Sequence, residues 1–390
     1  MSFFVTLSLL LGSGYGYIAY RLIAPLELGG AGIAVGVLGV LSMIALSFSA
    51  MVLPFRFPRH RWPRYIAWAA YVLFGFLCLV ATLLVLRDLG WALAGVFADT
   101  LPPEPGDRRW LLGVLNGIVL GAAGLLSLYG LRQARRTARV VRVDVPVADL
   151  HPDLAGFTIA QISDVHVGAT IRSDYVRAIV ERVNKMEPDL IAVTGDLVDG
   201  TVAQLREQVA PLAELAAAHG VYFVPGNHDY YSGARSWIQH VESLGMVALI
   251  NEHRVIQPAA PAQDREAAAN MVVGGVTDPV AHNFVPEHRS DPHRAMQGAP
   301  AADFRLLLAH QPQSVFAAEE AGFDLQICGH THGGQFFPAT IFVHFVQPYV
   351  AGLKRHGRMW IYVNRGTGYW GPPLRLNAPS EITLLTLVPA

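Results

Sequence analysis

Long runs of apolar residues fill the first third of the chain, and charged positions interrupt them only between the runs. Each run is long enough to cross a hydrocarbon core of roughly 30 Å as a helix. The first run has no positively charged segment before it and no small-residue cleavage site, so it is read as a retained span and not a signal peptide. The pattern therefore predicts an all-α four-helix transmembrane domain over residues 1–131. The predicted spans are Met1–Tyr20, Leu28–Phe55, Tyr65–Leu86 and Trp110–Leu131.

From about Val143 the pattern changes to short β-type runs that alternate with amphipathic segments, which is typical of an α/β domain. We expect this domain to cover residues 151–390, after a basic linker at 132–150. Strands are predicted at Thr158–Ile162, Leu190–Thr194, Val221–Val224, Val272–Val276, Leu306–Ala309, Leu325–Cys328, Trp360–Val363 and Ile382–Leu387. Helices are predicted near Asp174–Met186, Val202–Ala218, Ala234–Leu244 and Ser314–Ala321. Two stretches without periodicity, Gln257–Asn270 and Asp278–Ala302, are predicted to be loops.

Composition agrees with a protein that lies partly in lipid, because 52% of the residues are hydrophobic and only 15% are charged. The net charge of -1 provides no basic field for nucleic acid, so no nucleic-acid partner is expected. The two cysteines, Cys78 and Cys328, both lie in apolar surroundings, which argues against a disulfide framework.

Arginines are distributed unequally between the two sides of the predicted spans. One side carries Arg56, Arg59, Arg61 and Arg64 without an acid, and also the run from Arg132 to Arg142 that follows the fourth span. The loop on the other side mixes arginine with aspartate and glutamate. The positive-inside rule then predicts an integral, multi-pass membrane protein with both termini and the α/β domain in the cytoplasm.

Five short polar motifs each follow the carboxyl end of a predicted strand, where α/β folds place reactive groups. They are Asp164-Val165-His166, Gly195-Asp196-Leu197-Val198-Asp199, Gly226-Asn227-His228-Asp229, His310, and Gly329-His330-Thr331-His332. Any one motif alone is as compatible with an ordinary polar turn. Together they would bring carboxylate, amide and imidazole donors around one pocket. Such donors without thiolate suit Mn, Fe, Zn or Mg ions.

These five blocks resemble the signature of the calcineurin-like metallophosphoesterase family, D-x-H, GD-x-x-D, GNH-D/E, H and GH-x-H, in the same order. Gly329–Gln335, together with Arg365–Gly371 and Ser380–Thr383, is similar to the membrane-associated phosphodiesterase branch of that family. The resemblance covers the last 245 residues or so and implies a four-layer α/β/β/α metallophosphoesterase sandwich behind the transmembrane domain.

The resemblance also implies roles for single residues. Asp164, His166, Asp196 and His332 would hold one divalent metal ion, and Asn227, His310 and His330 would hold a second together with the shared Asp196. Manganese is favoured, with zinc, iron or magnesium as alternatives. A metal-bound hydroxide would attack phosphorus. His228 would stabilise the transition state or protonate the leaving oxygen, and Asp229 would orient its ring. Asp199 is expected to support the ligands and not to bind metal.

The substrate is expected to be a phosphorylated small molecule or a lipid-linked phosphate, cleaved at a phosphodiester or pyrophosphate bond. The apolar stretch Phe336–Val346 is either a buried strand plus a turn or an interfacial patch that contacts membrane lipid. Lys354, Arg355 and Arg358 form a solvated basic turn or hold a second phosphate. Two alternatives to this function are a phosphomonoesterase acting on soluble substrates and a metal-dependent, non-catalytic membrane scaffold or sensor. The sequence leaves the oligomeric state open.

Overall fold

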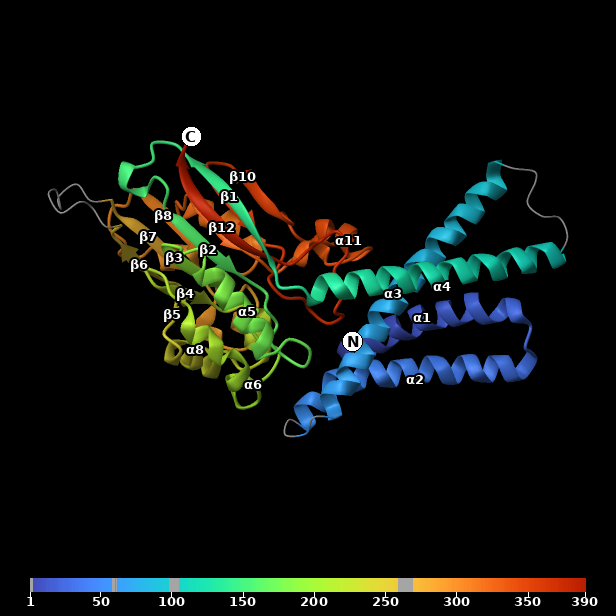
Figure 1. Ribbon diagram of the computed structural model, residues 1–390. Coiled ribbons are helices and arrows are strands. Elements are labelled where there is room, and N and C mark those ends of the chain that lie inside the picture. Colours follow the sequence, from blue (N-terminus) through green and yellow to red (C-terminus); the bar gives the residue numbers. More distant parts are fainter. Residues whose placement is uncertain (1–2, 58–59, 61, 98–104, 259–268) are drawn as a thin grey trace. The chain divides into compact units, whose positions relative to one another are not determined.

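The computed structural model describes residues 3–57, 60, 62–97, 105–258 and 269–390 of the chain. The chain divides into two compact units (Figure 1). We call Met1–Gln133 with Gly371–Leu376 the helical unit, and Ala134–Trp370 with Asn377–Ala390 the sheet unit. The short segment Gly371–Leu376 thus leaves the sheet unit, joins the helical unit and returns.

The helical unit consists of long apolar helices joined by short connections. They are α1 (Phe3–Ile23), α2 (Gly29–Arg56), α3 (Trp62–Phe97) and α4 (Pro105–Arg135). Three stretches of the described chain are long and apolar enough to cross a membrane: Gly29–Ala50, Trp62–Gly95 and Asp107–Arg135. These helices support a membrane protein. The first predicted span forms α1, and its crossing of a membrane stays a prediction.

Within the helical unit, Gly371–Leu376 lies against two glycines of the long helices. A Cβ added at Gly130 of α4 would lie 2.4 Å from a methyl carbon of Leu374, and one at Gly75 of α3 would lie 3.1 Å from Pro372. The Arg375 backbone N–H donates to the Gly130 carbonyl at 3.1 Å. Small residues at these two helix positions therefore let the segment approach the helix backbones closely.

The sheet unit contains two six-stranded sheets. In the first sheet the strand order is β1 (Arg139–Val147), β12 (Glu381–Pro389), β2 (Thr158–Ile162), β3 (Leu190–Thr194), β4 (Val221–Val224) and β5 (Val247–Ala248). In the second sheet it is β10 (Gly352–His356), β11 (Met359–Val363), β9 (Leu325–Cys328), β8 (Phe304–Leu308), β7 (Met271–Gly275) and β6 (Glu252–Ile256). Strands β2 to β5 run parallel, and so do β7, β8, β9 and β11.

Three apolar cores join the layers of the sheet unit. The central core lies between the sheets and includes Ile159 of β2 and Leu306 of β8, both fully buried. An outer core packs the first sheet against α5 (Ser173–Asn184), α6 (Val202–Val209) and α8 (Ala234–Ser243). The other outer core packs the second sheet against α9 (Pro292–Ala295) and α10 (Val315–Glu320). This arrangement confirms the predicted four-layer α/β/β/α sandwich (Figure 1).

All eight predicted strands are present, with ends shifted by two residues or fewer. The segment 132–150, predicted to be a basic linker, instead contains the end of α4 and strand β1. Strand β1 pairs with β12 over nine residues but lies at the sheet edge. Its exposed arginines are typical of a linker, which is why the sequence pattern did not predict a strand there. The predicted helix Val202–Ala218 ends at Val209 and continues as the 3₁₀ helix Ala210–Glu214, because Pro211 lacks the N–H that an α-helix needs.

The remaining irregular stretches also depart from expectation in part. The predicted loop Asp278–Ala302 contains α9 and two 3₁₀ turns, Ala281–Asn283 and Pro286–His288. Residues 259–268 of the other predicted loop lie outside the described residues. The strand-plus-turn alternative for Phe336–Val346 is wrong, because Ala339–Val346 forms helix α11. No residue of α11 is buried, and Phe342 and Phe345 are 62% and 80% exposed.

Candidate metal centre

Five strand ends bring the predicted motifs together, three from the first sheet and two from the second. Asp164 and His166 follow β2, Asp196 follows β3, and α7 (Asn227–Tyr231) follows β4. His310 follows β8, while His330 and His332 follow β9. Backbone hydrogen bonds join the first two loops, because the N–H groups of Asp164 and His166 donate to the carbonyls of Gly195 and Asp196, both at 3.0 Å.

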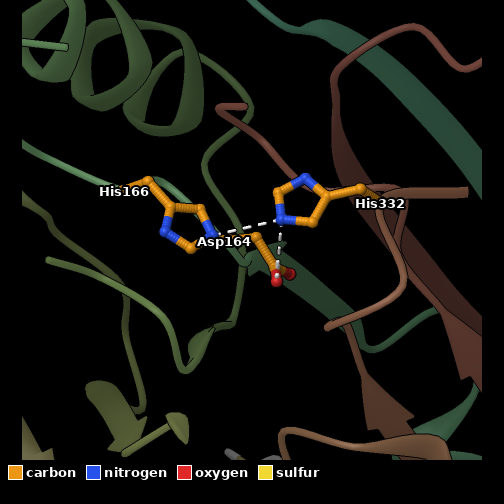
Figure 2. Close-up of side chains that lie close together, drawn as sticks. All are labelled: Asp164, His166 and His332. Carbon is orange, nitrogen blue, oxygen red and sulfur yellow. Dashed lines mark hydrogen bonds and ion pairs between the residues drawn. The ribbon is translucent and has the colours of Figure 1, made fainter. Parts of the chain in front are cut away.

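The first donor group consists of Asp164, His166 and His332, whose side chains point toward one another (Figure 2). The Nε2 atoms of His166 and His332 are 3.1 Å apart. The His332 Nε2 lies 3.5 Å from a carboxylate oxygen of Asp164. All three residues are buried. Ring nitrogens and a carboxylate oxygen that face one another at these distances form a ready set of ligands for a divalent cation.

The second donor group consists of Asp196, His310 and His330. The His310 Nε2 lies 3.1 Å from Asp196 Oδ2 and 3.2 Å from His330 Nδ1. The other nitrogen of His310, Nδ1, is 2.8 Å from the Thr194 carbonyl, which leaves Nε2 free to face the group. The two groups adjoin, since Asp196 Oδ2 is 3.8 Å from His166 Nε2. Asp196 therefore lies where it could serve both ions.

The side-chain oxygen of Asn227 shows whether the site suits a cation. Its side chain is buried, and its Oδ1 atom has no hydrogen-bond partner within the part of the chain that the structure describes. A buried amide oxygen without a partner costs free energy of about 1–3 kcal/mol. A divalent ion would satisfy that oxygen. The donor set and this oxygen therefore both fit the two-metal assignment.

Asp199 makes contacts that link the two groups to His228. Its Oδ1 atom lies 2.7 Å from Nδ1 of His228 and 3.2 Å from Nδ1 of His166. A carboxylate oxygen only accepts, so these contacts need a proton on Nδ1 of both rings, and Nε2 of His166 faces His332 in the first group. This geometry agrees with the supporting role expected for Asp199.

Asp229 was expected to orient the His228 ring, but the structure gives that contact to Asp199. The Asp229 carboxylate instead accepts backbone N–H groups of Gly226 at 2.8 Å, Leu197 at 3.0 Å and Val198 at 3.3 Å. The reason is that α7 begins at Asn227, so Asp229 in its first turn points back at the loop that precedes the helix. Asp229 thus joins the metal-site loops after β3 and β4.

Two glycines let the loops approach the donors. A Cβ at Gly329 would lie 2.0 Å from an oxygen of Asp164, and one at Gly226 would lie 2.3 Å from an oxygen of Asp196. No side chain other than hydrogen fits at such distances. The glycines of the GH-x-H and GNH motifs are therefore required by the close approach of backbone to carboxylate.

Charge coupling inside the site shifts several pKa values. Burial raises the pKa of Asp164. Burial opposes ionisation of Asp196, but the imidazoles of His310 and His228 hold its pKa well below the usual range. Burial and the neighbouring His310 lower the pKa of His330 to about 3, so this ring is neutral and free to bind a cation. Burial alone would lower the pKa of His228, but the carboxylates of Asp199 and Asp196 raise it to about 9.

The family of this chain follows from the segment that holds the polar motifs. Residues 157–334, which contain all five motifs, match the sequence profile of the family described as calcineurin-like phosphoesterase. The chain carries a calcineurin-like metallophosphoesterase domain. This confirms the resemblance on which the predicted fold and ligands rest.

Three relatives show the extent of this likeness. A transmembrane protein with metallophosphoesterase domain from Danio rerio is 34% identical over 275 residues, which make up 69% of this chain and 62% of the relative. The protein of the same description from Bos taurus is 35% identical over 286 residues, or 72% and 64% of the two chains. An uncharacterized metallophosphoesterase from Helicobacter pylori is 36% identical over 237 residues, or 59% and 60%. The chain thus spans less than two thirds of the length of these relatives.

Sequence reasoning assigned no role to two residues that shape the metallophosphoesterase site, Ser163 and Gln335, although Gln335 ends the block Gly329–Gln335. Ser163 donates from Oγ to Asp164 Oδ2 at 2.6 Å, and its place directly before the first motif was the available signal. The side chain of Gln335 holds the backbone of Trp370, with its Nε2 donating to the carbonyl and its Oε1 accepting the N–H, both at 3.0 Å. Contacts of this kind depend on the tertiary fold and leave no local pattern.

The three basic residues considered for a second phosphate lie on or beside the hairpin β10–β11. The Arg355 guanidinium lies 5.0 Å from the Trp360 ring centroid, and its Nε donates to the Gly357 carbonyl. The Arg358 backbone N–H donates to Glu319. Lys354 is exposed. These contacts favour the solvated basic turn.

Proposed function

We propose that this protein is a membrane-anchored, dinuclear-metal phosphoesterase that hydrolyses a phosphodiester or pyrophosphate bond. One observation supports the proposal most strongly. Two largely buried donor groups adjoin at Asp196, and the buried amide oxygen of Asn227, which begins the helix after β4, has no hydrogen-bond partner among the described residues. A scaffold that merely binds metal would have no use for His228, whose ring is held at the edge of these groups by Asp199.

Each residue of the site then has a defined task. Asp164, His166, His332 and Asp196 would hold one ion, and Asp196, Asn227, His310 and His330 would hold the other. Bound divalent ions supply Lewis-acid polarisation of the phosphoryl group and activation of water as a nucleophile. Asp199 accepts from Nδ1 of His166 and of His228. Because the effect of burial on the His228 pKa is outweighed by the carboxylates of Asp199 and Asp196, which raise it to about 9, this ring would be an imidazolium that donates from Nδ1 to Asp199 and from Nε2 to the leaving oxygen.

A lipid-borne phosphate is the substrate class that the surroundings support. The same chain contains three stretches long and apolar enough to cross a membrane, and two relatives are named as transmembrane proteins. By the positive-inside rule the domain would act at the cytoplasmic surface. A reporter fused at Ala390 that reads as extracytoplasmic would contradict this orientation.

Helix α11 supplies a second argument for lipid. Its exposed Phe342 and Phe345 would enter the headgroup region and hold the site near a lipid-borne phosphate. Changing both to Ser should lower turnover of a lipid phosphodiester in liposomes but not of a soluble ester. Phe316→Ser, at a 54% exposed position on α10, is the matched control. Unchanged turnover of the lipid substrate by the double variant would argue against this role of α11.

The function is tested by assaying the full-length protein with bis(p-nitrophenyl) phosphate and p-nitrophenyl phosphate. A panel of Mn, Zn, Fe and Mg identifies the activating metal. His228→Ala should lower kcat on the diester by a factor on the order of 10²–10⁴ while two equivalents of metal remain bound. His293→Ala, at an exposed histidine on α9, is the matched control. Preference for the monoester would indicate a phosphomonoesterase, and metal binding without turnover would indicate a scaffold.

A further inference from the structure

Three exposed aromatic side chains lie at the edge of the metal centre beside His228. Tyr231, Phe284 and Trp370 are 56%, 50% and 53% exposed. The ring centroids of Tyr231 and Trp370 are 5.2 Å and 5.6 Å from that of His228, and the Phe284 centroid is 5.4 Å from that of Tyr231. We call these three side chains the aromatic rim. They come from three separate segments: the end of α7, the turn after Ala281–Asn283, and the loop between β11 and β12.

Contacts within the fold hold the aromatic rim in place, although its side chains are exposed. The Trp370 backbone is fixed on both sides by the Gln335 side chain, and Gln335 follows the ligand His332 by three residues. Phe284 is supported by Tyr230 as well as Tyr231, with ring centroids 6.3 Å and 5.4 Å away. Large apolar side chains that converge beside a polar centre are typical of ligand sites, in which a few polar groups orient an otherwise apolar ligand.

The position of His228 decides what the rim would contact. Its backbone N–H donates to Asp196 Oδ1 at 2.8 Å, which ties it to the shared carboxylate of the metal groups. Its ring lies between these groups and the rim. If His228 serves the leaving oxygen, as the proposed function holds, then the group attached to that oxygen extends over the aromatic side chains.

We propose that the aromatic rim is a subsite for an apolar leaving group on the scissile phosphate. The Tyr231 and Trp370 rings are inclined by 57° and 69° to the His228 ring, and the Tyr231 and Phe284 rings by 55° to each other, so none of these pairs is stacked in parallel. The exposed faces of these rings could contact an alkyl or isoprenoid chain of a lipid, or an aryl ring. The shared chemistry is apolar contact area beside the phosphoryl site, and a polar leaving group such as phosphate would gain nothing from it.

The test measures binding and not turnover. Full-length protein in lipid nanodiscs with Mn is titrated with methylphosphonate, hexylphosphonate and phenylphosphonate, and empty nanodiscs correct for partition into lipid. The wild type should bind the two larger phosphonates about ten-fold more tightly than methylphosphonate. Trp370→Ala should remove most of that preference and leave methylphosphonate affinity within about two-fold, while Trp370→Phe should retain the preference. A larger loss for hexylphosphonate indicates a chain, and a larger loss for phenylphosphonate indicates a ring.

Control variants separate the rim from a general effect on the protein. Phe284→Ala should act like Trp370→Ala, whereas Phe316→Ala, at an exposed phenylalanine on α10, should not change the preference. Metal content measured on each variant shows that the centre is intact. Equal affinity of the wild type for all three phosphonates, no binding of any of them, or a preference that survives Trp370→Ala and Phe284→Ala would overturn the proposal. Absent hydrolysis with an intact preference would instead refute the proposed function alone.

Discussion

Asp199 offers the sharpest test of how the site is organised, because one carboxylate oxygen contacts two imidazoles with different tasks. The 2.7 Å contact to His228 is short for a charge-assisted hydrogen bond, and the 3.2 Å contact to His166 is at the long end. Hydrogen bonds to charged groups contribute about 1.5–3 kcal/mol, and neutral ones about half of that. Asp199→Asn keeps an acceptor oxygen but loses the charge, so about half of each contact should remain. Asp199→Leu removes both contacts.

These energies translate into a graded loss of activity. Since about 1.4 kcal/mol corresponds to a factor of ten, kcat on an aryl phosphodiester should fall roughly ten-fold in Asp199→Asn and roughly a hundred-fold in Asp199→Leu. Metal affinity should fall less, because the contact to the predicted ligand His166 is the longer one. Both variants should still bind two equivalents of metal at saturation. Asp174→Asn, at an exposed carboxylate in the first turn of α5, should behave as wild type.

Two results would refute this reasoning. If elemental analysis finds one equivalent of metal missing from Asp199→Asn at saturation, then Asp199 is itself a ligand. If kcat is unchanged in both variants, then the two hydrogen bonds do not position the rings during turnover.

Three further substitutions test the loops that surround the metal centre and the core between the sheets. Gly329→Ala would place a Cβ 2.0 Å from the Asp164 carboxylate, so metal content measured by elemental analysis should fall below two equivalents. Asp229→Asn would turn an NH₂ group toward backbone N–H donors, and thermal unfolding should show a loss of about 1–3 kcal/mol. Phe304→Ala in the core between the sheets should cost about 3–5 kcal/mol of unfolding free energy, while the exposed Phe316→Ala should cost less than about 0.5 kcal/mol.

The buried strands were predictable because each is a short run, rich in β-branched and aliphatic residues, in which nearly every side chain is buried. Thr158–Ile162 and Leu325–Cys328 have the predicted ends. The edge strands β1, β6 and β10 were missed because their exposed faces carry charged residues, and only their pairing with inner strands makes them β-structure. Helix α11 was missed for the opposite reason: an apolar run suggests burial, yet no residue of it is buried.

The positions of the site residues followed from motifs at strand ends, and the structure brings six of the seven predicted ligands into two adjoining groups, while Asn227 begins the helix after β4. Their roles as ligands stay a prediction. Which of Asp199 and Asp229 contacts the His228 ring could not be predicted, because both are acidic and both follow glycine-containing turns. Only the start of α7 at Asn227 turns Asp229 toward the backbone and leaves the two imidazoles to Asp199.

Five of the predicted ligands have a strained, left-handed backbone. Asp164, His166, Asp196, His330 and His332 all have positive φ angles, between 50° and 71°. The left-handed conformation costs a non-glycine residue about 1–2 kcal/mol, so glycine would be favoured at these positions if only the backbone mattered. Part of this cost is offset by the hydrogen bonds that the loops exchange, such as those from the N–H groups of Asp164 and His166. These left-handed residues lie in the loops after β2, β3 and β9, where they turn the chain so that its donors face one another. If these five side chains are metal ligands, as the proposed function holds, the cost of their left-handed backbone is the cost of placing donors where a metal ion needs them.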